Sequence, residues 1–229
     1  MPRSFTYSAL TLRVKPSGES NREAWFLTAE EGLLRATVFG GPKSRLRARV
    51  APFHGGTLYI YHDPVRDSRK VSDFDVHSYR PGIRELYERA MAAGAVAETI
   101  LSSHGGGGLW KEAANLAGNV LDAIDAADAA LCSRLSVYFF WHWAEILGVR
   151  PDISALSDTG NDSYPGEESG FPVRLDPGAR LWLKAIESLP AAALARVTLD
   201  APSLEQAKAF SHAVLADALG KKLPTWDGI

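Results

Sequence analysis

Apolar and polar residues alternate at the start of the chain, which is the pattern of a strand with one buried face. In residues 6–15 every second side chain is expected to point into a core. This set is Ser8, Leu10, Leu12 and Val14. The opposite face, expected to be exposed, holds Thr11, Arg13 and Lys15. Pro16, Ser17 and Gly18 then end the strand, because proline and glycine favour turns.

Four more short strands follow, each bounded by turn residues. They are predicted at 25–27, 33–39, 57–61 and 70–76. In the fourth strand, Leu58 and Ile60 would point inward and Tyr59 and Tyr61 outward. Five short strands in about eighty residues predict a small closed barrel. The five-stranded OB-fold is the nucleic-acid-binding barrel of this size, and an SH3-like barrel would give much the same pattern.

After Pro81 the apolar residues recur at the spacing of helices. Helices are predicted at about 86–101, 109–124, 129–147, 178–189 and 203–219. Leu86 and Ala90 would begin the buried stripe of the first helix, and Leu109 that of the second. The third helix is apolar nearly all round, which is typical of a helix in the middle of a bundle. The glycine-rich residues 102–108 are expected to form a flexible linker.

The predicted fold class is therefore α+β with more than one domain. We expect an OB-fold barrel over residues 1–80 and an all-α helical domain over residues 81–229, which includes a long polar loop at 152–178. No run approaches eighteen apolar residues, so we expect no membrane span. The first residues contain no apolar secretory segment, and a cytoplasmic protein is expected.

Charge is distributed unevenly between the two parts. Residues 1–84 contain 14 lysines and arginines against 8 acidic residues, although the whole chain has a net charge of −2. The rest of the chain is correspondingly acidic. A basic first third indicates that this part meets a polyanion such as nucleic acid.

The densest group of cations lies just after the third predicted strand, in a segment that begins with Gly40, Gly41 and Pro42. Its cations are Lys43, Arg45, Arg47 and Arg49, and no acidic residue occurs between Glu31 and Asp63. In an extended segment, Arg45, Arg47 and Arg49 would share one side. Long cationic side chains without nearby carboxylates suit phosphate binding, to which Ser44 and the glycine amides would add neutral donors.

Other basic residues of the barrel would support this segment. They are Arg22, Arg35, Arg66, Arg69 and Lys70. Phe39, Tyr59 and Tyr61 offer rings on which bases could stack, although ordinary packing explains such residues equally well. Together these residues make the barrel a candidate DNA-binding domain.

Motifs of catalysis or cofactor binding are missing. One segment, His104-Gly105-Gly106-Gly107, resembles the oxyanion-hole loop of some esterases. Such a loop requires a G-x-S-x-G nucleophile motif, and the chain contains none. A nucleotide-binding P-loop is absent, and the six histidines lack the spacing of metal ligands. The single cysteine, Cys132, excludes a cysteine zinc site and is expected to be buried. We expect no enzyme, no cofactor and no metal.

Several of these segments resemble one family in the same order. Gly18-Glu19-Ser20, residues 26–34 (FLTAEEGLL) and residues 40–45 (GGPKSR) resemble the N-terminal domain of RecO, the bacterial recombination mediator. Tyr87, residues 147–153 (LGVRPDI) and residues 219–223 (LGKKL) resemble its helical domain. Many members carry a four-cysteine zinc site in this domain. Here Leu156 and Thr159 occupy the places of the first cysteine pair, which implies a zinc-less variant with a degenerate zinc loop at 152–178.

The resemblance implies a DNA-repair mediator without enzymatic activity. Such proteins bind single- and double-stranded DNA and anneal complementary strands. They bind the C-terminal tail of single-stranded-DNA-binding protein (SSB) and act with RecR to load RecA onto SSB-coated DNA. The acidic helical domain offers only scattered cations for that tail, namely Lys111, Arg134, Arg180 and Lys184. Two alternatives stay open: an adaptor whose function lies in the helical domain, and an RNA-binding OB protein.

Overall fold

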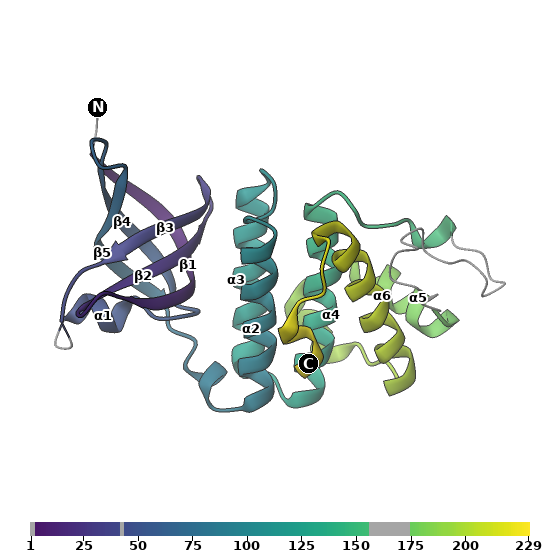
Figure 1. Cartoon of the computed structure of the whole chain (residues 1–229). Coiled ribbons are helices and arrows are strands. Elements are labelled where there is room, and N and C mark those ends of the chain that lie inside the picture. The colour runs from purple at the N-terminus through teal and green to yellow at the C-terminus, as the bar shows by residue number, and fades with distance from the viewer. Residues whose placement is uncertain (1–2, 42–43, 156–174) are drawn as a thin grey trace. The chain divides into compact units, whose positions relative to one another are not determined.

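The computed structural model describes residues 3–41, 44–155 and 175–229. All its strands lie before residue 81, and all its α-helices except the short α1 lie after it (Figure 1). The strands are β1 (Ser4–Ser17), β2 (Asn21–Thr28), β3 (Gly32–Val38), β4 (Gly55–Asp63) and β5 (Ser68–Ser78). The α-helices are α1 (Arg45–Arg49), α2 (Tyr87–Ser102), α3 (Trp110–Ala126), α4 (Ala129–Ile146), α5 (Pro177–Ile186) and α6 (Ala201–Leu219). Short 3-10 turns lie at Pro81–Arg84, Ile153–Ala155, Ala191–Arg196 and Pro224–Gly228.

The five strands close into a barrel, as the sequence predicts. Their order is β1-β2-β3-β5-β4, and β4 pairs back with β1 to complete the circle. All pairings are antiparallel except that of β3 with β5, where Thr37 lies beside Lys70. This strand order with one parallel pairing is that of the OB-fold, and it separates the domain from an antiparallel SH3-like barrel.

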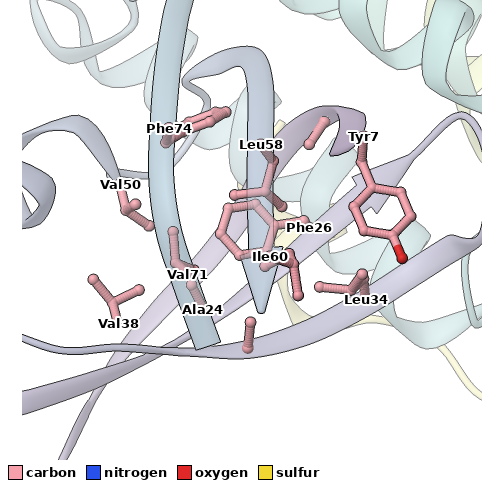
Figure 2. Close-up of a cluster of buried hydrophobic side chains, with 12 residues drawn as sticks. Tyr7, Ala24, Phe26, Leu34, Val38, Val50, Leu58, Ile60, Val71 and Phe74 are labelled. Atoms are coloured by element: carbon pink, nitrogen blue, oxygen red, sulfur yellow. The ribbon is translucent and has the colours of Figure 1, made fainter. Parts of the chain in front are cut away.

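The interior of the barrel is filled by side chains from all five strands (Figure 2). Phe26 and Phe74 meet edge to face at its centre, with ring centroids 6.0 Å apart. Leu58 and Ile60 point inward and Tyr59 outward, as the alternation in β4 predicts. Ordinary alternation therefore positions the core, and the alternate residues of each strand are left on the outer surface.

The predicted faces of β1 are wrong at its start and at Thr11, which is fully buried instead of exposed. Ser8 is exposed, whereas Tyr7 and Ala9 point into the barrel core. The register of β1 against β2 shifts between Thr11 and Arg13, which marks a bulge. A bulge inserts one extra residue and switches the side that later residues face. Simple alternation over residues 6–15 could not show this switch.

The glycines between α2 and α3 are packed, in contrast to the flexible linker that the sequence predicts. Gly105 and Gly106 are buried. A Cβ on Gly105 would lie 3.0 Å from the backbone nitrogen of Leu33 and 3.5 Å from Cδ1 of Leu27, on the outer side of the barrel. Gly105 also has a φ of +82°, which disfavours any other residue. These glycines permit close contact between backbone and barrel.

The chain forms two compact units. One joins Met1–Pro81 to Ala97–Leu121, and the other joins Gly82–Val96 to Asp122–Ile229. The predicted domain boundary between residues 80 and 81 stays a prediction. The segment Ala97–Leu121, which joins the end of α2 to most of α3, groups with the barrel and not with the other helices.

The second unit is helical and is built around α4. Its N-cap is Asp128, whose side chain accepts a hydrogen bond from the Leu131 amide. Residues 135–141 of α4 are all buried, and α4 contacts α5 and α6. The prediction of a central, apolar helix is confirmed. Within the described residues, no helix is long and apolar enough to span a membrane.

The ends of two helices differ from the sequence prediction. Leu86 precedes α2 and is 41% exposed, and Ala90 in its first turn is exposed as well. Leu109 precedes α3 and is 50% exposed. The buried part of α2 begins only at Ala92, because its first turn faces solvent. Apolar spacing alone could not place these first turns.

Candidate nucleic-acid interface

The basic segment after β3 ends in a short helix instead of an extended strand. Leu46 packs against the barrel core and Val50 is fully buried, so that residues four apart share the inner side. Helical spacing places Arg45 and Arg49 on neighbouring positions and turns Arg47 away from both. The single row of three arginines that an extended segment would give is therefore absent.

The cations of this segment have different surroundings. Arg45 is exposed, whereas the Nη1 atom of Arg49 lies 2.9 Å from a carboxylate oxygen of Asp73. Arg22 on β2 turns toward α1, where its Nη1 lies 3.4 Å from the carbonyl oxygen of Arg47. Partial burial and the nearby charge of Arg47 lower the pKa of Arg22. Lys43 lies outside the described residues.

The other predicted cations, Arg66, Arg69 and Lys70, also differ in their surroundings. Arg66 is exposed in the β4–β5 turn, and Arg69 lies 3.3 Å from the carboxylate of Glu31. The ammonium of Lys70 lies 5.3 Å from the centre of the Phe39 ring, which is 46% exposed. Since β5 runs beside β3, Lys70 joins the outer surface of β3.

Tyr59 and Tyr61, the two tyrosines predicted to stack on bases, lie on β4. Tyr59 is 41% exposed and lies opposite Asp73 of β5. The next outward residue of β5 is Asp75, so the strip around Tyr59 carries carboxylates, whereas Tyr61 lies opposite Lys70. A strip of this charge is a poor surface for a polyanion.

A basic surface with an aromatic centre lies on the outer side of β1, β2 and β3. Cross-strand pairing places Trp25 of β2 between Arg13 of β1 and Arg35 of β3. Two residues along, the next outward row runs from β1 to β5. This row consists of Lys15, Glu23, Thr37 and Lys70. We call the surface made by Arg13, Lys15, Glu23, Trp25, Arg35 and Lys70 the basic face.

Trp25 organises the cations of the basic face. The Lys15 ammonium lies 5.4 Å from the centre of its ring, and the Arg13 guanidinium carbon lies 6.0 Å from it. Cation–π attraction at this distance is worth about 0.5–1 kcal/mol for exposed groups. The Trp25 ring therefore keeps Arg13 and Lys15 on the same outer surface of the barrel. Neighbouring strands of a sheet are roughly 4.8 Å apart, so these cations lie close to those of the next strand.

The chemistry available on this face is electrostatic. It contains four cations against one carboxylate, Glu23, whose Oε1 lies 3.3 Å from Nε of Arg35. Lysine and arginine side chains neutralise phosphates without regard to base sequence. Strands 2 and 3 are also the surface that OB-folds use for oligonucleotides. The face is thus a candidate surface for a sugar–phosphate backbone.

Arg13, Lys15 and Trp25 are candidate site residues that sequence reasoning missed. Arg13 and Lys15 do fall on the polar side of the first predicted strand, and Trp25 falls in the second. Recognising them as one site requires the register of β1, β2 and β3, which pairs residues eight to fourteen positions apart. Local patterns carry no information on that register.

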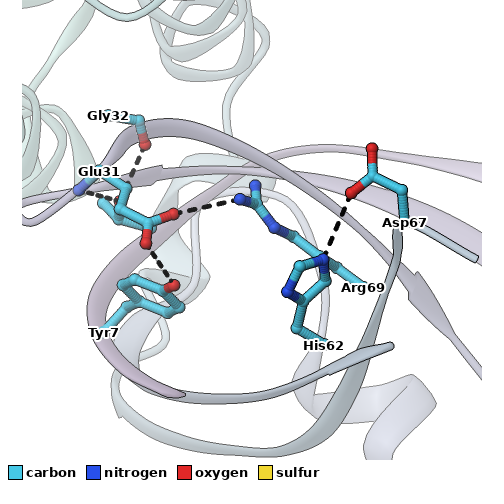
Figure 3. Close-up of polar contacts among 7 residues, drawn as sticks. Tyr7, Glu31, Gly32, His62, Asp67 and Arg69 are labelled. Carbon is cyan, nitrogen blue, oxygen red and sulfur yellow. Dashed lines mark hydrogen bonds and ion pairs between the residues drawn. The ribbon is translucent and has the colours of Figure 1, made fainter. Parts of the chain in front are cut away.

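Arg69 belongs to a polar network at the edge of the barrel (Figure 3). The Tyr7 hydroxyl donates to Oε1 of Glu31 at 2.8 Å, while Oε2 of Glu31 accepts from Arg69. The Thr28 hydroxyl donates to the Gly32 carbonyl and accepts from the Glu31 amide, which fixes the β2–β3 turn. Arg69 therefore pairs with Glu31 within this network and is not a free cation on the barrel surface.

We expect Tyr7 to titrate at unusually high pH. Burial, reinforced by the hydrogen bond to Glu31, raises the pKa of its hydroxyl to about 12. Because an unfolded tyrosine titrates near ~10, the stabilisation is complete below that pH and is lost as the pH rises toward 12. A difference titration of tyrosinate absorbance between the wild type and Tyr7→Phe isolates this group. A difference curve centred near 10 would contradict the network.

Among the described residues there is no cluster of three or more histidine, cysteine or carboxylate side chains that could hold a metal. Leu156 and Thr159, the predicted relics of a zinc loop, lie outside the described residues. Cys132 is buried, as predicted, and burial raises the pKa of its thiol to about 11.

The OB strand order and the basic, tryptophan-centred outer face define an oligonucleotide-binding type of barrel domain. Residues 1–79 match the family described as "Recombination protein O N terminal", so this barrel is a RecO N-terminal domain. No curated protein sequence matches the chain. The resemblance of the barrel is thereby confirmed, and that of Tyr87 and residues 147–153 and 219–223 stays a prediction.

Proposed function

We propose that the protein is a DNA-binding recombination mediator of DNA repair, in which the barrel binds DNA through its basic face. The observation that carries this proposal is the arrangement of Arg13, Lys15 and Arg35 around Trp25 on a RecO N-terminal barrel. Arg45 and Arg66 are exposed cations that extend the binding surface beyond the strands. Both single- and double-stranded DNA present the phosphates that these residues would bind.

The activity proposed for this surface is strand annealing without catalysis. Two complementary strands repel each other, and a protein that neutralises their phosphates brings them together without ATP. As partners we propose RecR and the C-terminal tail of SSB, with RecA loading onto SSB-coated single strands as the outcome. The RecO family resemblance supports these partners.

A fluorescence annealing assay tests the proposed function. Two complementary strands coated with SSB are mixed with and without the protein, at two salt concentrations and without ATP. We expect salt-sensitive acceleration. Retardation of naked DNA without any acceleration would favour an adaptor, and tighter binding to RNA than to DNA of equal length would favour an RNA-binding protein.

The basic segment 43–49 has its own variant in this assay. Replacing Lys43, Arg45, Arg47 and Arg49 with glutamate should abolish acceleration if these residues hold DNA. Arg49 also pairs with Asp73, so Arg45→Glu alone is the variant that leaves this ion pair intact. Unchanged annealing by the fourfold variant would remove the segment from the binding surface.

A further inference from the structure

One carboxylate stands among the cations of the basic face. Glu23 lies on β2 directly opposite Lys15 of β1 and Thr37 of β3, one row away from Trp25. Every other charged member of the face is an arginine or a lysine. A negative charge in this position opposes the binding of a polyanion, so it requires an explanation beyond general surface polarity.

The contact of Glu23 is with a cation that DNA would need. Its Oε1 lies 3.3 Å from Nε of Arg35, and the Arg35 side chain is 66% exposed. A carboxylate and a phosphate both offer anionic oxygens to a guanidinium and bind it in similar geometry. An exposed pair of this kind contributes little stability, so an incoming phosphate can displace it easily.

The other two ion pairs of the predicted site residues have additional roles in the fold. Glu31 accepts from Arg69 but also from the buried Tyr7 hydroxyl. Asp73 accepts from Arg49 and from the backbone amide of Phe74. Among the contacts of the described residues, the Glu23 carboxylate has Arg35 as its partner and no backbone or core group. Its contact thus concerns the surface, not the barrel.

We propose that the Glu23 carboxylate occupies a phosphate-binding position of the basic face and competes there with a phosphodiester of DNA. The inference rests on the proposed DNA-binding function and adds a determinant of affinity to it. Arg35 exchanges its internal carboxylate for an external phosphate when DNA binds. The exchange weakens binding and speeds release, which suits a protein that holds strands only until they pair.

The test compares Glu23→Gln with a matched control on another strip of the barrel. Glu23→Gln removes one negative charge without changing the size of the side chain. Asp75→Asn does the same on β5, where the side chain is 67% exposed and lies 3.6 Å from His77. Affinity of the full-length protein for a fluorescent oligothymidylate is measured by anisotropy over a series of salt concentrations.

Glu23→Gln should bind about two- to fivefold more tightly at low salt, the range that an exposed ion pair of up to about 1 kcal/mol allows. The slope of log affinity against log salt should steepen by about 0.7, because the variant has no released carboxylate that takes up a cation when Arg35 binds a phosphate. Glu23→Asp should keep the wild-type slope, and Asp75→Asn should change affinity by less than about 1.5-fold since salt screens distant charges.

The outcomes separate this inference from the proposed function. Equal or weaker binding by Glu23→Gln, with the wild type still binding DNA, overturns the competition alone. An equal gain in Glu23→Gln and Asp75→Asn also overturns it, because net charge would then explain both. A wild-type protein that fails to bind DNA at any salt concentration overturns the proposed function together with this inference.

Discussion

Reversing the charge of the basic face should nearly abolish DNA binding. In this variant Arg13, Lys15, Arg35 and Lys70 are all replaced with glutamate. Four phosphate contacts are lost and four repulsive charges are introduced, so affinity for single-stranded DNA at low salt should fall by about a hundredfold or more. The salt dependence of any remaining binding should be close to flat. Anisotropy titrations at several salt concentrations measure both effects.

The matched control carries the same change in net charge elsewhere. Arg84, Lys111, Arg196 and Lys221 are all exposed. Replacing these four with glutamate should weaken binding by less than about fivefold, as expected for charges that are not part of the basic face. Circular dichroism of both variants shows whether the barrel is intact. Comparable losses in the two variants would mean that net charge, and not the basic face, determines DNA binding.

Gly56→Ala should destabilise the barrel more than any change on its surface. Gly56 pairs with Ala9 of β1 and Val76 of β5, so β4 is held on both sides. A Cβ here would lie 2.0 Å from the carbonyl oxygen of Asp75 and 2.9 Å from Cα of Val76. Backbone must move to relieve these clashes, and we expect a loss of about 3 kcal/mol or more in the free energy of unfolding.

Urea unfolding of Gly56→Ala beside Gly41→Ala measures this effect. Gly41 precedes α1, and a Cβ there would meet nothing within 4 Å. Gly41→Ala should therefore change the free energy of unfolding by less than about 1 kcal/mol. A loss in Gly56→Ala no larger than in the control would contradict the close pairing of β4 with β5.

The barrel could be predicted because each of its strands is bounded by turn residues. Alternation identified Leu58 and Ile60 as inward residues, and turn signals separated β4 from β5. The bulge near Thr11 could not be predicted, because it depends on the register in which β1 pairs with β2. The helix α1 could not be predicted either. Leu46 and Val50 are four residues apart, as in a helix, but a helix of five residues is too short to show a helical period in the sequence.

The candidate site was only partly predictable. Composition correctly marked the first third as basic, and Arg35 and Lys70 do lie on the basic face. Arg69 and Arg49 form ion pairs with Glu31 and Asp73, which lie more than twenty residues away in sequence. Such pairs, like the contact of Lys15 with Trp25, follow from tertiary packing and leave no local signal in the sequence.

The most direct test of the central claim is to find where DNA touches the protein. Ultraviolet cross-linking of the full-length protein to an oligothymidylate, followed by mass spectrometry, identifies the attached peptides. We expect cross-links to concentrate between Arg13 and Arg35, with Trp25 as the principal site, and to disappear as salt rises. Cross-links confined to the unit formed by Gly82–Val96 and Asp122–Ile229 would contradict the basic face as the DNA-binding surface.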